Sequence, residues 1–576
     1  MAKNKYDNYS KEQLIAKLKQ LEKKQRFGLV WEDKPEDIAD QCERELPVLV
    51  EDKSKEIISD PKKPTHFIFE GDNYHTLYTL NFTHKKKIDV IYIDPPYNTG
   101  NKKEWLYNDH WIDENDRFRH SKWLSFMSKR LRLAKNLLKD GASIFISIGD
   151  DEVANLKLLC DKIFGANNFI TLISRISKTA SNKGKYFAPS CDYVLLYTKN
   201  AESLKKDSFS KEVNSDLYRK DDNDGLGMYR DDVALYQSSL DTRPNQRYYI
   251  ECPDGSLVIP PGNVFPDTKE DACFVLPKSN DDKVWRWSYP TYLQQKDLLV
   301  FKESKRSPLL NEVGKQARYN IYTKSYLNER QKKGVKPRNF LIGKEFLNRK
   351  GTDHIKKMGI KFNYSKPTAL IDDLIISTNT NKNAVILDFF AGSGTTGEVV
   401  IELNKKDKGN RQFILCTNNE NNICEEVTYP RMKAIINGYG KKKGIPANIK
   451  YYKTDFVPFA LTDNDKRTLV AKSTELLCIA ESTFEVVQQN IKKLDYAIFK
   501  NVTKQTAIIY DEDCIEKCCT ELNKTKSKHK TIIYVFSYDH TYEEDDFENL
   551  KIDFVVKPIP EAIINVYRKI SKLKNK

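Results

Sequence analysis

The stretch "VILDFFAGSGTTGEVV", residues 385–400, joins a short apolar run to a glycine-rich turn and the start of a helix. The apolar run is typical of a buried strand and ends at Asp388, after which Gly392 and Gly394 leave the backbone open to a ligand. Free N–H groups at a helix start favour a carboxylate or a phosphate. Because no Gly-Lys-Ser or Gly-Lys-Thr follows, the turn is not a phosphate P-loop, and its spacing is not GxGxxG. Taken alone, the stretch predicts a strand–turn–helix unit of an α/β protein with a ligand site at the turn.

Strand and helix patterns alternate on both sides of an irregular middle region. Apolar runs with strand character at residues 66–70 and 88–93 flank a helix pattern, and an amphipathic helix follows at 123–139. The same alternation returns after about residue 356. It predicts a parallel sheet with helices on both faces. The irregular region between is too long for a loop of one compact domain, so we interpret it as an inserted domain.

The expected organisation of the chain is a core in two halves, with an insert between them and a smaller segment at each end. These segments are 1–64 for an N-terminal helical segment, 65–200 and 356–450 for the two halves of the core, 201–355 for the insert, and 451–576 for a small C-terminal α/β domain. Within the first segment, residues 11–25 carry a leucine stripe among lysines, which is typical of an amphipathic helix.

The composition is that of an ordinary large intracellular protein. At 576 residues and 66.9 kDa the chain is too long for a single core. Mean hydropathy is −0.64, no apolar run could cross a bilayer and no signal-peptide pattern is present, so we expect a cytoplasmic protein without membrane contact. The formal net charge of +15 favours an anionic partner such as nucleic acid. Cys514, Cys518 and Cys519 form a cluster, but no second ligand pair accompanies it, so no metal site is expected.

A second informative stretch is "IDVIYIDPPYNTG", residues 88–100. A strand-like run stops at Asp94, Pro95, Pro96 and Tyr97. Prolines end strands because they cannot donate to the hydrogen-bond ladder, so one interpretation is that the two prolines only terminate the strand. Prolines also fix φ and remove backbone donors, which would present acceptors to a ligand in a preset geometry.

Together the two stretches resemble the amino-group methyltransferases of DNA that use S-adenosylmethionine (SAM). In this family the stretch that matches residues 88–100 is the catalytic one. Here it precedes the glycine-rich stretch at 385–400, and the insert lies between them. This is the order of the permuted β class. Three further segments resemble the modification subunits of type III restriction systems: residues 27–33, residues 418–431 and the C-terminal tail. The resemblance implies an α/β fold: a Rossmann-like SAM-dependent methyltransferase core with an inserted target recognition domain and a small C-terminal α/β domain.

The resemblance also implies how the catalytic residues act on the exocyclic N6 of adenine, a poor nucleophile whose lone pair is delocalised into the ring. Asp94 and the carbonyl of Pro95 would accept its two hydrogens, and Pro96 would help to fix the loop. Tyr97 would offer an aromatic face to a base taken out of the duplex stack. No covalent nucleophile and no metal is needed for methyl transfer.

For the cofactor, the family pattern implies a set of residues on both stretches and beside them. These are Asp72, Asn73, Lys366, Pro367, Asp388, Phe390, Ala391, Gly392, Ser393, Gly394, Thr395 and Asn418. Thr395 is expected near the carboxylate of SAM, while Asp72 could contact its adenine or simply cap a helix. An acid usually binds the ribose after the next strand, but this sequence has Thr417, Asn418 and Asn419 there, of which Asn418 is the expected ribose contact.

The function that the resemblance implies is site-specific methylation of adenine N6 in double-stranded DNA, by the modification subunit of a type III restriction-modification system. The expected partners are a second copy of the chain and a separate helicase–nuclease restriction subunit. Three alternatives remain open. One is N4-cytosine methylation, whose enzymes usually carry Ser in place of Asp94. The second is methylation of RNA or of a protein glutamine amide, whose enzymes more often carry Asn-Pro-Pro-Tyr. The third is a DNA-recognition scaffold for a restriction subunit with little activity of its own.

Overall fold

A computed structural model gives the fold of the chain. It describes residues 9–15, 31–32, 36–100, 117–179, 186–205, 208–211, 213–237, 245–270, 273–459, 462–489, 495–525, 530–539 and 541–574. The chain divides into two compact units, one made of Met1–Ser208 with Arg338–Lys576 and the other of Phe209–Pro337. Within the described ranges, no helix is both long and apolar enough to span a membrane.

The first unit is built around a sheet that has ten strands among the described residues, in the order β1-β20-β2-β17-β16-β3-β4-β6-β5-β15. Its strands are β1 Glu45–Glu51, β2 Thr65–Glu70, β3 Ile88–Ile93, β4 Leu138–Ile148, β5 Phe169–Ile176, β6 Cys191–Thr198, β15 Phe340–Leu341, β16 Val385–Asp388, β17 Gln412–Thr417 and β20 Asn448–Pro458. The strands from β20 to β4 run parallel, β1 is antiparallel to β20, and β6 is antiparallel to both β4 and β5. This arrangement confirms the predicted α/β fold.

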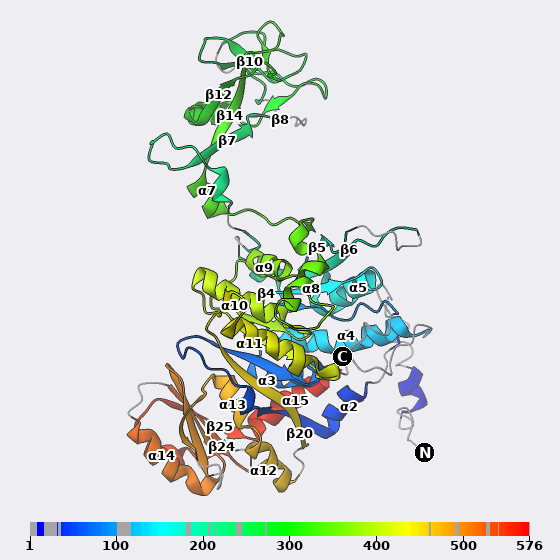
Figure 1. The fold of residues 1–576 in the computed structure, drawn as a ribbon, viewed down its shortest axis with the longest axis vertical. Coiled ribbons are helices and arrows are strands. Elements are labelled where there is room, and N and C mark those ends of the chain that lie inside the picture. Colours follow the sequence, from blue (N-terminus) through cyan, green and yellow to red (C-terminus); the bar gives the residue numbers. More distant parts are fainter. Residues whose placement is uncertain are drawn as a thin grey trace. The chain divides into compact units, whose positions relative to one another are not determined.

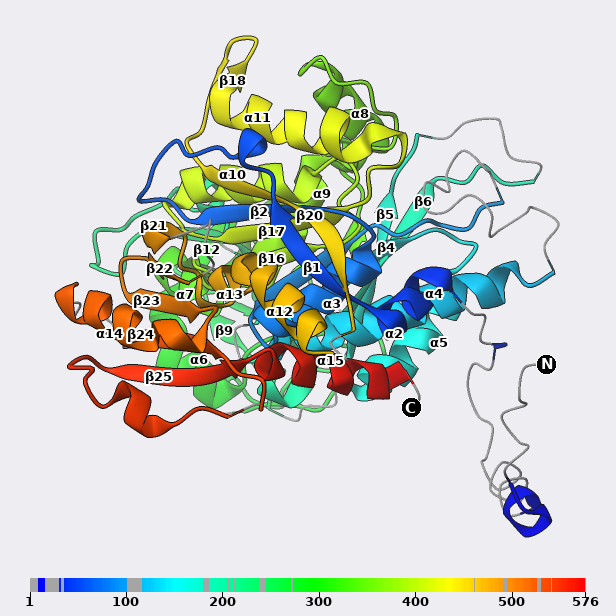
Figure 2. The ribbon, with the colours of Figure 1, turned by 90° about the horizontal axis from the view of Figure 1, so that it is seen from below.

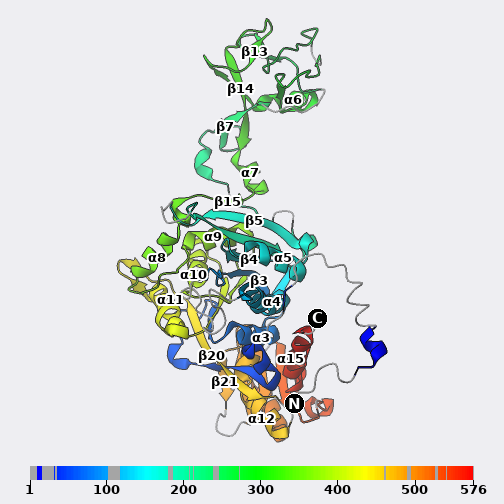
Figure 3. The same cartoon turned by 90° about the vertical axis from the view of Figure 1, so that its right-hand side faces the viewer.

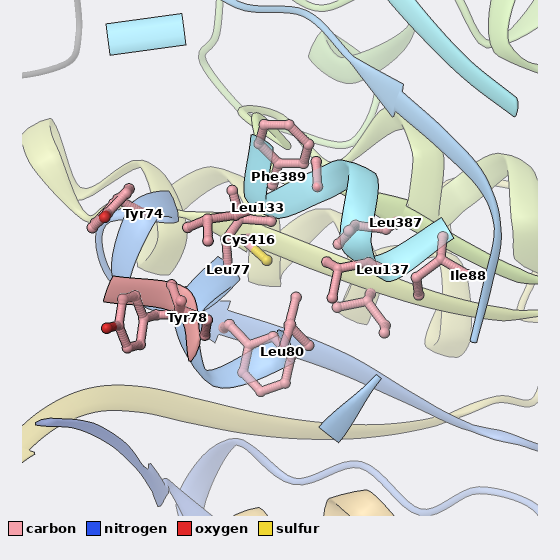
Figure 4. Packing of buried hydrophobic residues seen from close by; sticks show 14 of the residues in the cluster. Tyr74, Leu77, Tyr78, Leu80, Ile88, Leu133, Leu137, Leu387, Phe389 and Cys416 are labelled. Atoms are coloured by element: carbon pink, nitrogen blue, oxygen red, sulfur yellow. The ribbon is translucent and has the colours of Figure 1, made fainter. Parts of the chain in front are cut away.

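Helices cover both faces of the sheet. One group consists of α3 Asn73–Thr83, α4 Arg119–Leu137 and α5 Val153–Phe164, and the other of α9 Thr368–Ser377, α10 Thr395–Asp407 and α11 Tyr429–Asn437. Figure 2 shows the two groups on opposite sides of β16 and its neighbours, and Figure 3 shows α10 and α11 on the other side of β3 and β4 from α5. Figure 4 shows the core beneath the first group, with Tyr74, Leu77, Tyr78, Leu80, Leu133 and Leu137 close to Leu387 and Phe389. Burial of these large apolar side chains stabilises the packing of the first helix group on the sheet.

The first and last parts of the chain belong to this unit. Helix α2 (Asp37–Arg44) leads directly into β1, so the segment 1–64 is not separate from the sheet. Only residues 11–15 of the predicted N-terminal helix are described, and they are helical. The boundary expected at 451 falls inside β20, because that strand pairs with β2 along its first half and with β1 along its second.

The C-terminal region has a five-stranded sheet among its described residues, in the order β21-β22-β23-β24-β25. Its elements are α12 Asp463–Ala471, α13 Thr474–Glu481, β21 Glu485–Gln489, β22 Tyr496–Lys500, β23 Lys504–Ile509, α14 Ile515–Lys524, β24 Lys530–Phe536, β25 Phe554–Ile559 and α15 Glu561–Lys574. The hydroxyl of Tyr567 donates to the carbonyl of Pro47, and the hydroxyl of Tyr78 donates to the carbonyl of Tyr567. The region is therefore packed on the core rather than tethered to it (Figure 1).

The second unit is smaller and richer in β-structure. Its elements are β7 Tyr229–Ala234, β8 Tyr236–Gln237, β9 Ile250–Glu251, β10 Leu257–Ile259, β11 Val284–Trp285, α6 Tyr289–Gln295, β12 Leu299–Glu303, β13 Leu310–Asn311, β14 Tyr319–Tyr326 and α7 Leu327–Lys333. It has its own core, in which Tyr248 and Trp285 are fully buried. The unit is shorter than the 201–355 expected for the insert. Residues 338–355 lie with the first unit because β15 pairs with β5 there.

Candidate active site

The two informative stretches meet at one edge of the large sheet. Strands β3 and β16 are parallel neighbours, with Val90 paired to Ile386, so Asp94 and the glycine-rich turn follow the carboxyl ends of adjacent strands. In open α/β sheets, ligands bind outside these carboxyl ends. A cavity of about 400 Å³ lies there. The predicted site residues that line it are Asp94, Pro95, Pro96, Tyr97, Lys366, Asp388, Phe390, Ala391, Gly392, Ser393 and Thr395.

The carboxylate of Asp94 is held at one oxygen and open at the other. Its Oδ2 accepts a hydrogen bond from Lys366 Nζ at 2.7 Å. Its Oδ1 is buried and has no hydrogen-bond partner within the described part of the chain. A buried acceptor without a partner is costly, so a donor from a ligand in the cavity would satisfy it.

Pro96 and Tyr97 are held by contacts with residues outside the loop. The indole N–H of Trp123 donates to the Pro96 carbonyl at 2.8 Å. The ring of Tyr97 lies against Gly149, where a Cβ would come within 2.9 Å of the ring. Burial and the nearby Asp94 charge raise the pKa of Tyr97 well above its usual value, so its hydroxyl stays protonated. That hydroxyl also lacks a partner among the described residues.

The glycine-rich turn is shaped from within by Asp388. This carboxylate accepts from the backbone N–H of Phe390 at 3.1 Å and from Thr396 Oγ1 at 2.6 Å. Burial raises the pKa of Asp388 to about 7. Both glycines have positive φ, +48° at Gly392 and +73° at Gly394, which a side chain would strain.

The two glycines of the turn nevertheless do different things. Among the described residues, a Cβ at Gly392 would find only the Phe390 carbonyl oxygen within 4 Å, at 3.9 Å, so this residue leaves room on the cavity side. A Cβ at Gly394 would press on Thr428 at 3.2 Å and Met432 at 3.4 Å, in the protein interior. Gly394 therefore permits close packing and does not line the cavity.

Comparison with known proteins agrees with this geometry. A family model described as DNA methylase matches residues 88–428, which is more than half of the chain. The chain belongs to the DNA methylase family. The type III restriction-modification enzyme EcoPI Mod subunit of Escherichia phage P1 is 30% identical over 404 residues, covering 65% of this chain and 60% of that subunit. The type II methyltransferase M.KpnI of Klebsiella pneumoniae is 33% identical over 361 residues, covering 61% of this chain and 80% of that enzyme.

The chain spans 60% and 56% of the length of two type III Mod subunits that it matches, those of phage P1 and of Salmonella typhimurium. Among solved structures, a DNA modification methylase of Thermus thermophilus complexed with S-adenosyl-L-methionine is 12% identical. That match covers 67% of this chain and 98% of the other, with a TM-score of 0.31. The family membership rests on the sequence matches alone.

A buried arginine beneath the turn is the main feature of the site that the sequence did not indicate. Arg431, on α11, has a fully buried side chain. Its Nη1 donates to the hydroxyls of Ser365, Ser393 and Thr395, the last at 2.8 Å. All three residues line the cavity. A fixed positive charge behind a set of hydroxyls suits the binding of a carboxylate.

The arginine is paired on its other side with a buried acid. Arg431 Nε donates to Glu398 at 2.8 Å, and the second Glu398 oxygen contacts His354 Nε2 at 2.6 Å. Burial alone would raise the pKa of Glu398, but the His354 hydrogen bond and the Arg431 charge outweigh it and lower the pKa. Because α8 (Asn348–Lys356), α10 and α11 supply one residue each, the network joins three helices.

Some of the predicted cofactor residues do not reach the cavity. Asp72 caps α3 by accepting from the backbone N–H of Tyr74 at 2.7 Å, and it pairs with the buried Arg130 at 3.1 Å. Asn73 is buried and donates to the carbonyl of Phe389 at 2.9 Å, so it braces the turn from behind.

Two further predicted cofactor residues, Pro367 and Asn418, do not line the cavity. In each case the preceding residue in the sequence lines it. Pro367 precedes α9 as its N-cap, and its neighbour Lys366 lines the cavity. Asn418 is not a lining residue, but Thr417 is, and its hydroxyl is buried without a partner among the described residues. Thr417 ends β17, at the carboxyl end of a central strand, and the sequence had placed it directly before Asn418 at the expected ribose position.

Proposed function

We propose that this DNA methylase transfers a methyl group from SAM to N6 of adenine in a specific duplex sequence, as the modification and recognition subunit of a type III restriction-modification system. The single observation that supports this best is the Asp94 carboxylate. Its Oδ1 is buried beside the cavity without a partner among the described residues, while Lys366 fixes Oδ2. An amino group placed in the cavity would supply the missing donor.

The loop offers two acceptors for such an amino group. Besides Asp94 Oδ1, the carbonyl of Pro95 belongs to a residue that lines the same cavity, and the neighbouring Pro96 carbonyl is already engaged by Trp123. Two acceptors hold both N–H bonds and turn the nitrogen lone pair out of conjugation with the ring. Positive charge then develops on the nitrogen as it attacks, and the fixed carboxylate stabilises it. Tyr97, held against Gly149, offers its ring face to the base.

The rest of the cavity fits SAM. When bound, SAM supplies a methyl group on a positively charged sulfonium, so in-line positioning replaces a covalent nucleophile. Hydroxyls backed by Arg431 suit its carboxylate, and Gly392 leaves space at the turn. The buried hydroxyl of Thr417 suits a ribose hydroxyl and takes the role that the sequence assigned to Asn418. Asp72 and Asn73 then do not touch SAM. Asp72 caps α3, and Asn73 holds the glycine-rich turn in place through the carbonyl of Phe389.

The test of this activity is to incubate the purified chain with isotopically labelled SAM and genomic DNA, and to digest the DNA for mass spectrometry. N6-methyladenine is the expected product, and long-read sequencing of the same DNA should show it in one motif. N4-methylcytosine would contradict the adenine assignment. Specific DNA binding without any methyl transfer would favour the scaffold alternative.

We further propose that the methylase works as a homodimer on double-stranded DNA and binds a separate restriction subunit. The support is the similarity to proteins named as Mod subunits of restriction-modification enzymes. Light scattering with and without a duplex that carries the methylated motif should give a protein mass of twice the chain mass. A monomer mass at a concentration where methylation is complete would contradict the dimer.

A further inference from the structure

The connection between β5 and β6 lies at the same edge of the sheet as the cavity. Strand β4 is parallel to β3 and antiparallel to β6, and β6 is antiparallel to β5. Strand β5 therefore runs in the direction of β3 and β4, and its carboxyl end opens on the edge that carries Asp94. Residues at both ends of the connection line the cavity: Lys178 follows β5, and Asp192 is the second residue of β6.

Two consecutive aromatic side chains on this connection are almost fully exposed. Tyr186 is 83% exposed and Phe187 is 91% exposed. Neither residue lines the cavity, and neither belongs to a hydrophobic core of the described chain. Exposing adjacent aromatic rings is unfavourable in water, and it is typical of a contact surface when the rings lie beside a functional site.

We propose, resting on the function proposed above, that Tyr186 and Phe187 insert into the base stack of duplex DNA and fill the gap left by the base that enters the cavity. A base paired inside a duplex cannot reach Asp94, so it must rotate out, and this breaks its stacking and pairing. Apolar side chains wedged between base steps are a general means of holding such a distorted duplex. Aromatic rings suit the gap because any base can stack on them.

The distance that Phe187 can reach from the cavity and the positive charge of Lys178 both favour duplex DNA as the molecule that binds this surface. Phe187 is five residues before Asp192, so it can lie at most about 18 Å from the cavity wall along an extended chain. That distance is comparable to the major groove, which is about 12 Å wide and 8.5 Å deep. Lys178 is exposed at the cavity mouth, where a phosphate of the duplex would pass.

The experiment compares Tyr186→Ala, Phe187→Ala and the double variant on two duplexes. One duplex pairs the target base normally, and the other places an abasic site opposite it, so that the base is already unpaired. On the paired duplex we expect kcat/KM to fall about 10- to 100-fold in the double variant, the range that corresponds to loss of a base–aromatic stack. On the abasic duplex we expect kcat/KM within about threefold of the unmodified protein, because the wedge is no longer needed.

Matched variants separate this role from a structural one. Tyr186→Phe and Phe187→Trp keep the aromatic rings and should retain activity on the paired duplex. Val502→Ala changes another side chain that is 86% exposed, in the C-terminal region, and should leave activity on both duplexes unchanged. SAM affinity by calorimetry should be equal in all variants. Fluorescence of 2-aminopurine at the target position should rise on binding of the unmodified protein and rise less with the double variant.

Two outcomes would overturn the proposal: full activity of the double variant on the paired duplex, or an equal loss on both duplexes. Neither depends on which base is methylated. If the target is N4 of cytosine, the adenine assignment fails, and the same pair of duplexes built around cytosine still decides whether the aromatic pair acts as a wedge.

Discussion

At the scale of single residues, the sequence predicted which side chains face the cavity better than it predicted what holds them. Asp94 and Lys366 were both expected at the site, but their hydrogen bond was not, since they are 272 positions apart. Arg431 was missed because an arginine on a helix is ordinarily a solvent-exposed residue. Only the fold shows that it is buried under three hydroxyls.

The first prediction concerns Asp94. Asp94→Ala should lower kcat by about 100- to 1,000-fold, the effect of removing one group that stabilises developing charge. SAM affinity, measured by calorimetry, should stay within about threefold, because the carboxylate acts on the target base. Asp151→Asn, at an exposed position after β4, serves as the control. An equal loss of SAM affinity in Asp94→Ala would contradict the role assigned to it.

The second prediction separates the two glycines. Gly392→Val should abolish SAM binding and leave a folded protein, because its side chain would occupy the cavity side of the turn. Gly394→Val should lower the thermal unfolding temperature more than Gly392→Val does. Both variants carry the strain of a positive φ, but only at Gly394 does the new side chain also press on Thr428 and Met432. Thermal unfolding and calorimetry on both variants would check this, and the reverse ranking would show that the turn faces the other way.

At the scale of elements, periodicity predicted the alternation of strands and helices but not which strands are neighbours. Nothing in either stretch shows that β3 pairs with β16, because pairing of parallel strands depends on the path of the crossovers between them. The same limit explains the error at residue 451. A strand pattern continues there without a break, and only its pairing with both β1 and β2 reveals that it belongs to the large sheet.

The third prediction concerns the network that joins α8, α10 and α11. Arg431→Met should cost about 3–5 kcal/mol of unfolding free energy, since it leaves the Glu398 charge buried without its partner. The double variant Arg431→Met with Glu398→Gln should regain much of that stability. SAM affinity should remain low in both, because the hydroxyls that line the cavity have lost their cation. Recovery of SAM affinity with stability would show that the arginine has only a structural role.

The same network predicts a pH dependence of stability. The pKa of Glu398 is lower in the folded protein than its ordinary value, so the ionised carboxylate stabilises the fold. This contribution is present above the unfolded-state pKa of about 4.3 and is lost as the pH falls through the lower folded pKa. Urea unfolding of the unmodified protein and of Glu398→Gln should therefore differ most above about pH 5 and converge in acid. A difference that widened in acid would contradict this sign.

At the scale of the whole molecule, the loss of α/β periodicity predicted that an insert exists, and contacts set where it begins and ends. The separate unit Phe209–Pro337 has its own core around Trp285. The sequence placed the end of the insert at 355, because residues 338–355 have no clear periodicity. They belong with the first unit, where Asn348 lines the cavity and accepts from the buried Arg175 at 2.8 Å.

The fourth prediction is that residues 209–337 set the recognised DNA sequence. Replacing this unit with the corresponding unit of a related methylase should change the methylated motif and keep the same target atom, because Asp94 and its cavity lie wholly in the first unit. Long-read sequencing of DNA methylated by the hybrid would show this. An unchanged motif would place recognition in the first unit.

The pairing of β3 with β16 also has a consequence for how the chain is made. Strand β3 ends at Ile93 and its neighbour β16 begins at Val385, so about 300 residues must leave the ribosome before that neighbour exists. At about 5–20 residues per second, this takes about 15–60 seconds. Throughout that time a central and mostly apolar strand has one unpaired edge, which is a template for aggregation. The nascent first half of the chain should therefore depend on a chaperone that covers the open edge of β3 until β16 has been made.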